Sequence, residues 1–586
     1  MKLFFRSLIP ALLIALAWPT QADGAEMDLT GLWKAYRNFG SEVQGELIVT
    51  RTNKTLQADI AGHSFSMALT QKTQPVAFSV PGNKGSFEGY INGNELSGQW
   101  TQPAPVQVGQ KMTSPVHFTK TKSNQWTGMV RPRQSEFTFY LPVTKDEDGT
   151  YRTFLRNPDR NLGVYQNIKR IEVEGDRLTF VGPSRRSGDE QTYFEGVLHR
   201  DEDYFSVSMS AYRGGTYDFH RVEDTGNSTF FPRGENPEPY MYSVPVAVND
   251  GWKTAHLEKV GIRFDPLKQM IEKEIDPAAT SVNDLDLHGI LIARKGKLVF
   301  EQYFNGMHRN QPHDTRSASK SMASLLVGAS MQAGFEVSPQ TKVYESVSPD
   351  VTTMTLDARK DMTLEHLLTM SSGFYCDDND DDAPGNENTM QEQQGKPDWY
   401  RYTLALPMAY EPGETAIYCS ANSNLIGAVL RATTGQPVSE LFAQHIAQPL
   451  DIKRYYLGLQ PTGEVYLGGG AQWLPRDFMK IGQLMLNNGT WNGKRIVSKQ
   501  WVKNSIASQV EIDGREYGYQ WWITEYPYKD RSVRAFFAGG NGGQVVMGIP
   551  ELDLLVTFFG GNYSHRMSRY SNDVLIPDYI LKAVDE

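Results

Sequence analysis

The chain has 586 residues, of which 39% are hydrophobic, and it contains no long single-letter tract, so disordered, collagen-like and fibrous proteins are excluded. Asp and Glu (68) outnumber Lys and Arg (58), giving a formal net charge of −10. This balance provides no general attraction to nucleic acid or anionic lipid, and we expect no nucleic-acid partner. The length suits about two to four domains.

Residues 1–22 have the pattern of a cleaved signal peptide. Lys2 and Arg6 precede an apolar run over residues 8–18, and small residues stand near Ala22, where a signal peptidase would cut. The run is shorter than the roughly 20 apolar residues that span a bilayer. We therefore predict a periplasmic or secreted protein that has no membrane span after cleavage.

Residues 23–232 predict an all-β region. Apolar and polar residues alternate in short runs such as 46–50, 56–60, 65–69 and 87–91, with turn signals at Asn92-Gly93 and at residues 174–176. A break near residues 102–123 divides the region into two β modules, 23–122 and 123–232, each a barrel or a sandwich. We expect these modules to serve packing or recognition, for example in contact with the cell envelope. Residues 233–245 contain three prolines and are interpreted as a linker.

Residues 246–586 change character. Helical periodicity appears over 264–275, 319–333, 364–370, 424–432, 438–446 and 477–487. Strand patterns lie at the two ends, over 288–293 and 297–304 and again over 535–538, 544–549 and 554–559. Strands from both ends with helices between them predict an α+β domain, in which one antiparallel sheet is flanked by helices and carries a helical subdomain.

The sequence Ser317-Ala318-Ser319-Lys320 opens one of these predicted helices. Three residues are nearly one helical turn, so Lys320 and Ser317 would share a face, and the Ser317 N–H at the helix start would be free to bind an oxyanion. Lys320 acts as a base only if burial or nearby cations depress its pKa. The alternative is that Ser317 caps the helix and Lys320 is solvated.

Two further features could contribute chemistry. Tyr418 lies on a turn-rich segment before a predicted helix, where a phenol could move a proton, although loop tyrosines more often serve packing. The run Gly539-Gly540-Asn541-Gly542-Gly543 enters a predicted strand, and so many glycines indicate close approach of the backbone to a substrate or to another element.

Together these elements resemble the serine hydrolases related to class C β-lactamases, penicillin-binding D-alanyl peptidases, Ser-x-x-Lys esterases and 6-aminohexanoate-dimer hydrolases. The resemblance covers about 252–579 and rests on these ordered stretches: 313–321, 367–373, 418–427, 491–493, 517–522 and 560–563. It implies a β-lactamase/transpeptidase-like fold that needs no cofactor and no metal. It also implies that Ser317 is the acylated nucleophile, Lys320 its proton acceptor and Tyr418 a second acid and base, with Gly540 and Asn541 completing the oxyanion hole.

Two departures from the family pattern bear on the substrate. Tyr418-Cys419-Ser420 stands where class C β-lactamases have Tyr-x-Asn, so Ser420, with Asn422 nearby, would replace a substrate-orienting carboxamide. Ala538-Gly539-Gly540 lacks the cation that the family uses to bind an antibiotic or peptide carboxylate. Both favour an ester or amide substrate over a β-lactam or a D-alanyl peptide.

The two cysteines, Cys376 and Cys419, could form a disulfide or remain buried thiols, and the sequence leaves both open. The acidic run at residues 377–382 follows Cys376. Clustered carboxylates suit calcium, but Ala383 occupies the position where an EF-hand loop needs glycine. We therefore interpret the run as a solvated loop at the rim of the site, without a metal.

The leading hypothesis is an exported serine hydrolase that cleaves a small ester, amide or peptide-like substrate through an acyl-enzyme on Ser317. One alternative is a penicillin-binding or peptidoglycan-associated protein, a D-alanyl peptidase or β-lactamase relative with slow turnover. Another is an adhesion or scaffold protein built on an inactive hydrolase fold.

Overall fold

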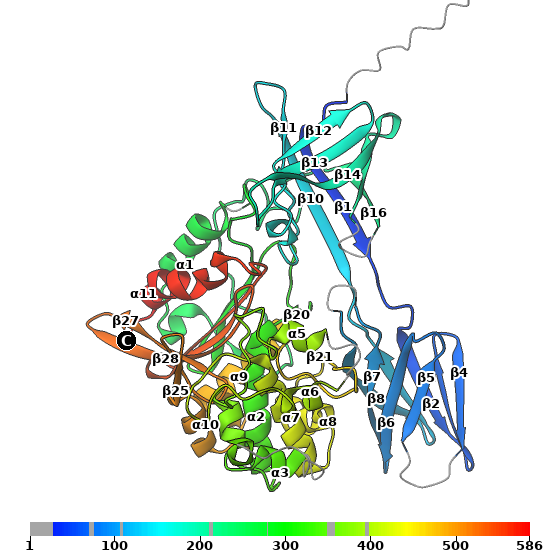
Figure 1. Ribbon diagram of the computed structural model, residues 1–586, viewed down its shortest axis with the longest axis vertical. Coiled ribbons are helices and arrows are strands. Elements are labelled where there is room, and N and C mark those ends of the chain that lie inside the picture. The colour runs from blue at the N-terminus through cyan, green and yellow to red at the C-terminus, as the bar shows by residue number, and fades with distance from the viewer. Residues whose placement is uncertain are drawn as a thin grey trace, which may run out of the picture.

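A computed structural model describes residues 27–68, 75–105, 109–209, 215–277, 279–347, 358–392 and 398–585 (Figure 1). The predicted signal peptide lies outside these residues. Within them, no helix is both long enough and apolar enough to cross a membrane. The chain forms a small barrel, a second β unit and a large α+β domain.

The barrel is a closed sheet whose interior is filled by aromatic side chains. Trp33, Phe139, Phe180 and Phe205 are all fully buried inside it, as alternation of apolar and polar residues requires. Its strands, in order around the barrel, are β1 (Gly31–Asn38), β10 (Glu136–Lys145), β11 (Tyr151–Arg152), β12 (Arg170–Glu174), β13 (Arg177–Pro183), β14 (Glu190–His199), β15 (Tyr204–Ser208) and β16 (Thr216–Arg221).

The second β unit has its own core around Leu47, Phe87, Trp100 and Trp126. A Cβ atom on Gly85 would lie 2.2 Å from the Trp100 ring, so the indole needs glycine at that position. The strands are β2 (Gly45–Arg51), β3 (Thr55–Ile60), β4 (His63–Ala68), β5 (Val76–Val80), β6 (Gly85–Asn92), β7 (Glu95–Gln102), β8 (Met112–Lys122) and β9 (Gln125–Val130).

The strand pairing differs from the predicted division at 122/123. That boundary separates β8 from β9, which pair with each other, while β1 leaves the first module and pairs with β10 over Gly31↔Val143 to Asn38↔Glu136. Residues 45–130 are therefore inserted between two neighbouring strands of the barrel. Both units show the same alternation, which does not specify partners. The partners of β1 are instead set by contacts between side chains distant in sequence, such as Trp33 and Phe205, whose ring centroids are 4.8 Å apart.

The predicted linker has no helix or strand, as its prolines require, but it packs against the α+β domain. Arg233 forms an ion pair of 2.7 Å with Asp276, and Tyr240 is buried. The Tyr242 hydroxyl donates a hydrogen bond of 2.8 Å to the Val299 carbonyl. Its aromatic side chains attach the segment where a flexible linker would leave it free.

The α+β domain is built on a sheet from both ends of residues 253–560, which confirms the predicted architecture. Neighbouring strands are antiparallel except β17 and β19. The order is β17 (Lys253–Thr254), β19 (Lys297–Tyr303), β18 (Leu287–Arg294), β30 (Leu554–Gly560), β29 (Gln544–Ile549), β28 (Arg531–Gly540), β27 (Trp522–Tyr528), β26 (Arg515–Tyr517) and β25 (Val510–Ile512).

Helices cover both faces of this sheet, because successive residues of β18 and β30 are apolar and point to opposite faces. One face packs against α1 (Phe264–Met270), its π-helical continuation Ile271–Ile275, the π-helix Ser571–Ile580 and α11 (Leu581–Ala583). The other packs against a helical layer: α2 (Lys320–Gln332), α3 (Val343–Val347), α4 (Leu364–Leu368), α5 (Glu387–Gln391), α6 (Trp399–Leu404), α7 (Ser420–Thr434), α8 (Val438–Phe442), α9 (Pro475–Leu486) and α10 (Lys499–Ser505).

A ladder of short strands joins the second β unit to the α+β domain. Strand β8 pairs with β21 (Tyr455–Gly458), β21 with β22 (Gln472–Trp473), and β22 with β20 (His313–Asp314). Strand β20 ends three residues before Ser317. The N-terminal β region is therefore connected by backbone hydrogen bonds to the segment that enters the predicted nucleophile turn.

Candidate active site

Ser317 lies in a tight 3-10 turn, Arg316–Ser319, that leads directly into α2. Arg316 has a φ of +48°, a conformation that costs energy for a non-glycine residue. Two contacts hold it there: the Arg316 N–H donates to Asp314 Oδ1 at 2.9 Å, and the guanidinium pairs with the same carboxylate at 3.1 Å. The backbone before the serine is therefore fixed by its neighbours.

Lys320 is at the first position of α2 and is 1% exposed. Its Nζ lies 2.9 Å from Ser317 Oγ, which places the amine beside the hydroxyl as the spacing predicts. Burial alone lowers the pKa of Lys320, but Tyr418, Glu387 and Asp378 together outweigh burial, so this pKa lies above its usual value. The condition that burial or cations depress the pKa of Lys320 is therefore not met, because Tyr418, Glu387 and Asp378 act on the amine in the opposite direction.

Tyr418 comes from the loop before α7 and reaches the same amine. Lys320 Nζ lies 4.9 Å from the centre of the Tyr418 ring, and the phenol acts on the pKa of Lys320 both through its charge and as a side-chain hydrogen-bond partner. The ring stacks on Trp522 with centroids 5.8 Å apart, and packs against Met370 and Tyr517. The structure thus brings Ser317, Lys320 and Tyr418 together.

The glycine-rich turn between β28 and β29 lies against the Ser317 turn. A Cβ atom on Gly540 would lie 2.4 Å from the Thr315 carbonyl oxygen and 2.9 Å from the Ala318 nitrogen, so this close approach requires glycine. The Asn541 side chain is used elsewhere: its Oδ1 accepts a hydrogen bond of 2.7 Å from the Ser564 N–H. Any contribution of Asn541 to an oxyanion hole would come from its backbone.

Ser420, predicted to stand in for a substrate-orienting carboxamide, is bonded to an acid of the protein. It is fully buried at the start of α7, and its hydroxyl and N–H donate to Asp378 Oδ2 at 2.6 and 2.8 Å. Asn422 is 2% exposed, and its Oδ1 has no hydrogen-bond partner among the described residues. An unpaired buried acceptor fits a group that meets a ligand.

A disulfide between Cys376 and Cys419 ties the acidic run to this site. Asp378, interpreted from sequence as part of a solvated rim loop, is instead half-buried next to the catalytic candidates and donates its N–H to the Tyr418 carbonyl at 3.0 Å. Burial raises the pKa of Asp378, while Lys320 acts in the opposite direction. Sequence reasoning missed this residue because its partner, Ser420, is 42 positions away.

Glu387 is a second missed acid at the site. It accepts a hydrogen bond of 2.5 Å from the Tyr466 hydroxyl and contributes to the raised pKa of Lys320. Across the described ranges, no group of three or more His, Cys, Asp or Glu side chains could hold a metal ion. Asp378 and Glu387 both act on the pKa of Lys320, and each accepts a hydrogen bond from a neighbouring hydroxyl.

An α+β fold with a Ser-x-x-Lys turn and a tyrosine over the lysine defines a serine hydrolase. The chain belongs to the Beta-lactamase family, whose model matches residues 283–581, just over half of the chain.

Among curated proteins, the chain is similar to the 6-aminohexanoate-dimer hydrolase of Paenarthrobacter ureafaciens, at 26% identity over 326 residues, which is 50% of this chain and 82% of the relative. Two solved structures are also similar. Simvastatin synthase from Aspergillus terreus is 18% identical with a TM-score of 0.43, covering 54% of this chain and 98% of its own. The octameric penicillin-binding protein homologue from Pyrococcus abyssi is 19% identical with a TM-score of 0.39, covering 50% and 74%.

Proposed function

We propose that the protein hydrolyses an ester or amide through an acyl-enzyme on Ser317. The observation that carries this proposal is the 2.9 Å contact between Lys320 Nζ and Ser317 Oγ, with the Tyr418 ring against the same amine. A serine hydroxyl is a weak nucleophile unless a neighbouring group takes its proton. The lysine and the tyrosine are the two groups in reach of that task.

Lys320 and Tyr418 act together as one base. Moving a proton from the phenol to the amine converts a neutral pair into an ammonium and a phenolate without changing the number of protons held. In both arrangements Lys320 Nζ stays within hydrogen-bond distance of Ser317 Oγ, at 2.9 Å. Either arrangement accepts one proton from Ser317.

The reaction then proceeds in two halves. Ser317 Oγ bonds to the substrate carbonyl carbon while its proton passes to the pair, and the tetrahedral intermediate collapses as the pair protonates the departing alcohol or amine. Water repeats the sequence on the acyl-enzyme and releases the carboxylic acid. The Ser317 N–H and the backbone at Gly540 and Asn541 stabilise the oxyanion.

Two features favour an ester or amide without a required carboxylate. The end of β28 is Ala538-Gly539-Gly540 and offers backbone but no cation beside the nucleophile turn. The Ser420 hydroxyl is bonded to Asp378 and cannot replace an orienting carboxamide. Export belongs to the same proposal, supported by the pattern of residues 1–22 and by a disulfide, which persists in an oxidising compartment.

Replacing the nucleophile tests this proposal. We expect Ser317→Ala to reduce hydrolysis of a p-nitrophenyl ester by at least about a thousandfold and to abolish labelling by a fluorophosphonate. Ser330→Ala is the matched control, because Ser330 is on α2, the helix that follows the Ser317 turn, and its buried hydroxyl has no partner within the described part of the chain. That variant should keep full activity.

Unchanged turnover in Ser317→Ala, or a fluorophosphonate adduct on another residue, contradicts the assignment. Incubation with a fluorescent penicillin distinguishes the proposed hydrolase from the alternative, a penicillin-binding protein with slow turnover. A long-lived adduct without ester turnover would indicate a penicillin-binding protein, and rapid ester hydrolysis without label supports the hydrolase.

A further inference from the structure

Two buried histidines lie directly behind the nucleophile turn. His288 on β18 and His313 on β20 are 1% and 6% exposed, and His288 Nδ1 lies 2.6 Å from His313 Nε2. The outer nitrogens each meet a carbonyl oxygen: His288 Nε2 lies 2.6 Å from that of Pro158, and His313 Nδ1 lies 3.0 Å from that of Asp314. The four groups form one continuous row.

The row fixes the number of protons on the two rings. A carbonyl oxygen only accepts hydrogen bonds, so each outer nitrogen must carry an N–H, and the contact between the rings needs one proton between its two nitrogens. That makes three ring protons. Two neutral imidazoles carry only two, so the satisfied row holds one positive charge.

An acid lies beside His288 at the outer end of the row. Its Nε2 lies 3.7 Å from Asp286 Oδ1, and the Asp286 Oδ2 is buried without a hydrogen-bond partner among the described residues. Burial and the charge of His288 hold the pKa of His313 well below its usual value. Other charged groups facing the pair are Asp159, Asp314, Arg133, Arg156 and Arg160.

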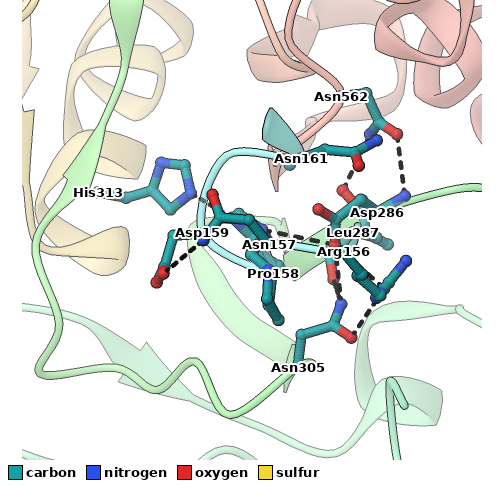
Figure 2. A network of polar contacts seen from close by, with 12 residues as sticks. Arg156, Asn157, Pro158, Asp159, Asn161, Asp286, Leu287, Asn305, His313 and Asn562 are labelled. Carbon is teal, nitrogen blue, oxygen red and sulfur yellow. Dashed lines mark hydrogen bonds and ion pairs between the residues drawn. The ribbon is translucent and has the colours of Figure 1, made fainter. Parts of the chain in front are cut away.

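One end of the row belongs to the barrel. Pro158 lies on the loop between β11 and β12, and Figure 2 shows this loop running between His313 on one side and Asp286, Asn305 and Asn562 on the other. The loop is anchored by Arg156, which pairs with Asp286 at 3.5 Å, and by Asn161, which donates to the Val282 carbonyl at 2.9 Å. Its position is therefore defined by buried contacts.

The other end of the row belongs to the active site. His313 holds the carbonyl of Asp314, whose carboxylate in turn accepts the Arg316 N–H and keeps Arg316 at positive φ, one residue before Ser317. Loss of the shared proton would leave one contact of the row without a hydrogen. The turn would then lose part of its support.

We propose that His288 and His313 are positioning residues for Ser317, sharing one positive charge that links the barrel loop to the nucleophile turn. The effect on catalysis rests on the function proposed above, whereas the proton count does not.

Histidine-labelled NMR on the full chain tests the charge directly. With ¹⁵N-labelled histidine, His288→Gln and His313→Gln identify the signals of the pair. We expect three ring N–H protons at the pH of full activity, and two above the pH at which the shared proton is lost. Two protons throughout the active pH range would overturn the proposal, even if the ester assay succeeds.

The pH dependence of acylation tests the link to Ser317. We expect His288→Gln to slow acylation by about tenfold with little change in KM, and to remove the alkaline loss of activity that belongs to the pair. Asp286→Asn should move that loss to lower pH by about one unit or more, because a carboxylate stabilises a nearby cation. His63→Gln, on β4 of the second β unit, is the control.

A folded His288→Gln enzyme, judged by circular dichroism, that keeps the wild-type pH profile would contradict the proposal, as would an unmoved profile in Asp286→Asn. If Ser317→Ala retains activity while the pair still shows three protons, the proposed function fails and the charged pair stands.

Discussion

At the scale of single residues, Asp314 is buried at a cost in stability and supports the backbone of the nucleophile turn. Burial raises its pKa from 3.8 to about 6, against the opposing effect of Arg160 and Arg133. The same carboxylate holds the Arg316 backbone in its strained conformation. Burying an ionisable carboxyl costs stability. The location of Asp314 is therefore better explained by its contacts with Arg316 in the nucleophile turn.

This pKa predicts how stability depends on pH. Between about pH 4 and pH 6 the folded chain keeps a proton on Asp314 that the unfolded chain has lost, so the free energy of unfolding falls as pH rises, by up to about 3 kcal/mol. Asn has no proton to lose. The melting temperature of Asp314→Asn relative to wild type should therefore be higher at pH 7.5 than at pH 4.5.

Thermal unfolding of both proteins at the two pH values measures this difference, with Asp530→Asn, at an exposed turn, as the control for removing one carboxylate. Parallel melting curves for Asp314→Asn and wild type across the range would show that Asp314 carries no such cost. Activity of the variant relative to wild type should fall at pH 7.5, where wild-type Asp314 is ionised and the amide pairs less strongly with Arg316, and should fall less at pH 4.5, where the wild-type carboxyl is itself protonated.

At the scale of elements, the acidic loop and the start of α7 form one unit. The disulfide joins Cys376 to Cys419, the Asp378 N–H bonds to the Tyr418 carbonyl, and Asp378 accepts both hydrogen bonds from Ser420. The position of Tyr418 thus depends on a loop about 40 residues earlier in the chain. Covalent and polar contacts act together there.

Removing the disulfide should loosen both segments. The bridge closes a loop of 43 residues, and in the chain-entropy model such a loop is worth about 4 kcal/mol. We expect Cys376→Ser with Cys419→Ser to lower the melting temperature by several degrees and to reduce kcat more than it changes KM. Wild type treated with dithiothreitol should behave like the double variant. Equal melting temperatures and equal kcat would contradict this account.

Much of this architecture can be predicted from local sequence patterns. The features that could not be predicted all depend on contacts between residues distant in sequence. The strands at both ends of the α+β domain, α2 and the Ser317–Lys320 pair follow from periodicity and one-turn spacing, and the structure contains them. The partner of β1, the bond between Ser420 and Asp378 and the raised pKa of Lys320 depend on residues distant in sequence. Alternation and spacing carry no information about such pairs.

At the scale of the whole molecule, the N-terminal β region packs directly against the α+β domain. Arg133, just after β9, donates to Gln472 Oε1 at 2.5 Å, and Gln472 pairs with Asp314 across β22 and β20. The Tyr456 hydroxyl donates to the Arg131 carbonyl at 2.8 Å, and Gln99 to the Ser439 carbonyl at 3.1 Å. A separable recognition module would not need contacts this close to the nucleophile turn.

Arg133→Met tests this connection. The change removes the hydrogen bond to Gln472 while preserving most of the side-chain volume, so we expect kcat to fall about three- to tenfold, KM to stay nearly constant and the melting temperature to drop. Arg131→Met is the matched control, because Arg131 is exposed and contributes its backbone carbonyl. Identical kinetics for the two variants would show that the β region supports the site in some other way.

The insertion of residues 45–130 between β1 and β10 also sets the order in which the chain can assemble. During synthesis, β1 emerges about 100 residues before β10 and about 180 residues before β16, the two strands against which it pairs. Until the barrel strands from β10 to β16 have all emerged, Trp33 and its neighbours have no complete core to enter, and unpaired apolar strands promote aggregation. The barrel can therefore close only after residues 216–221 have emerged, and until then its first strand is the barrel segment most exposed to wrong pairing.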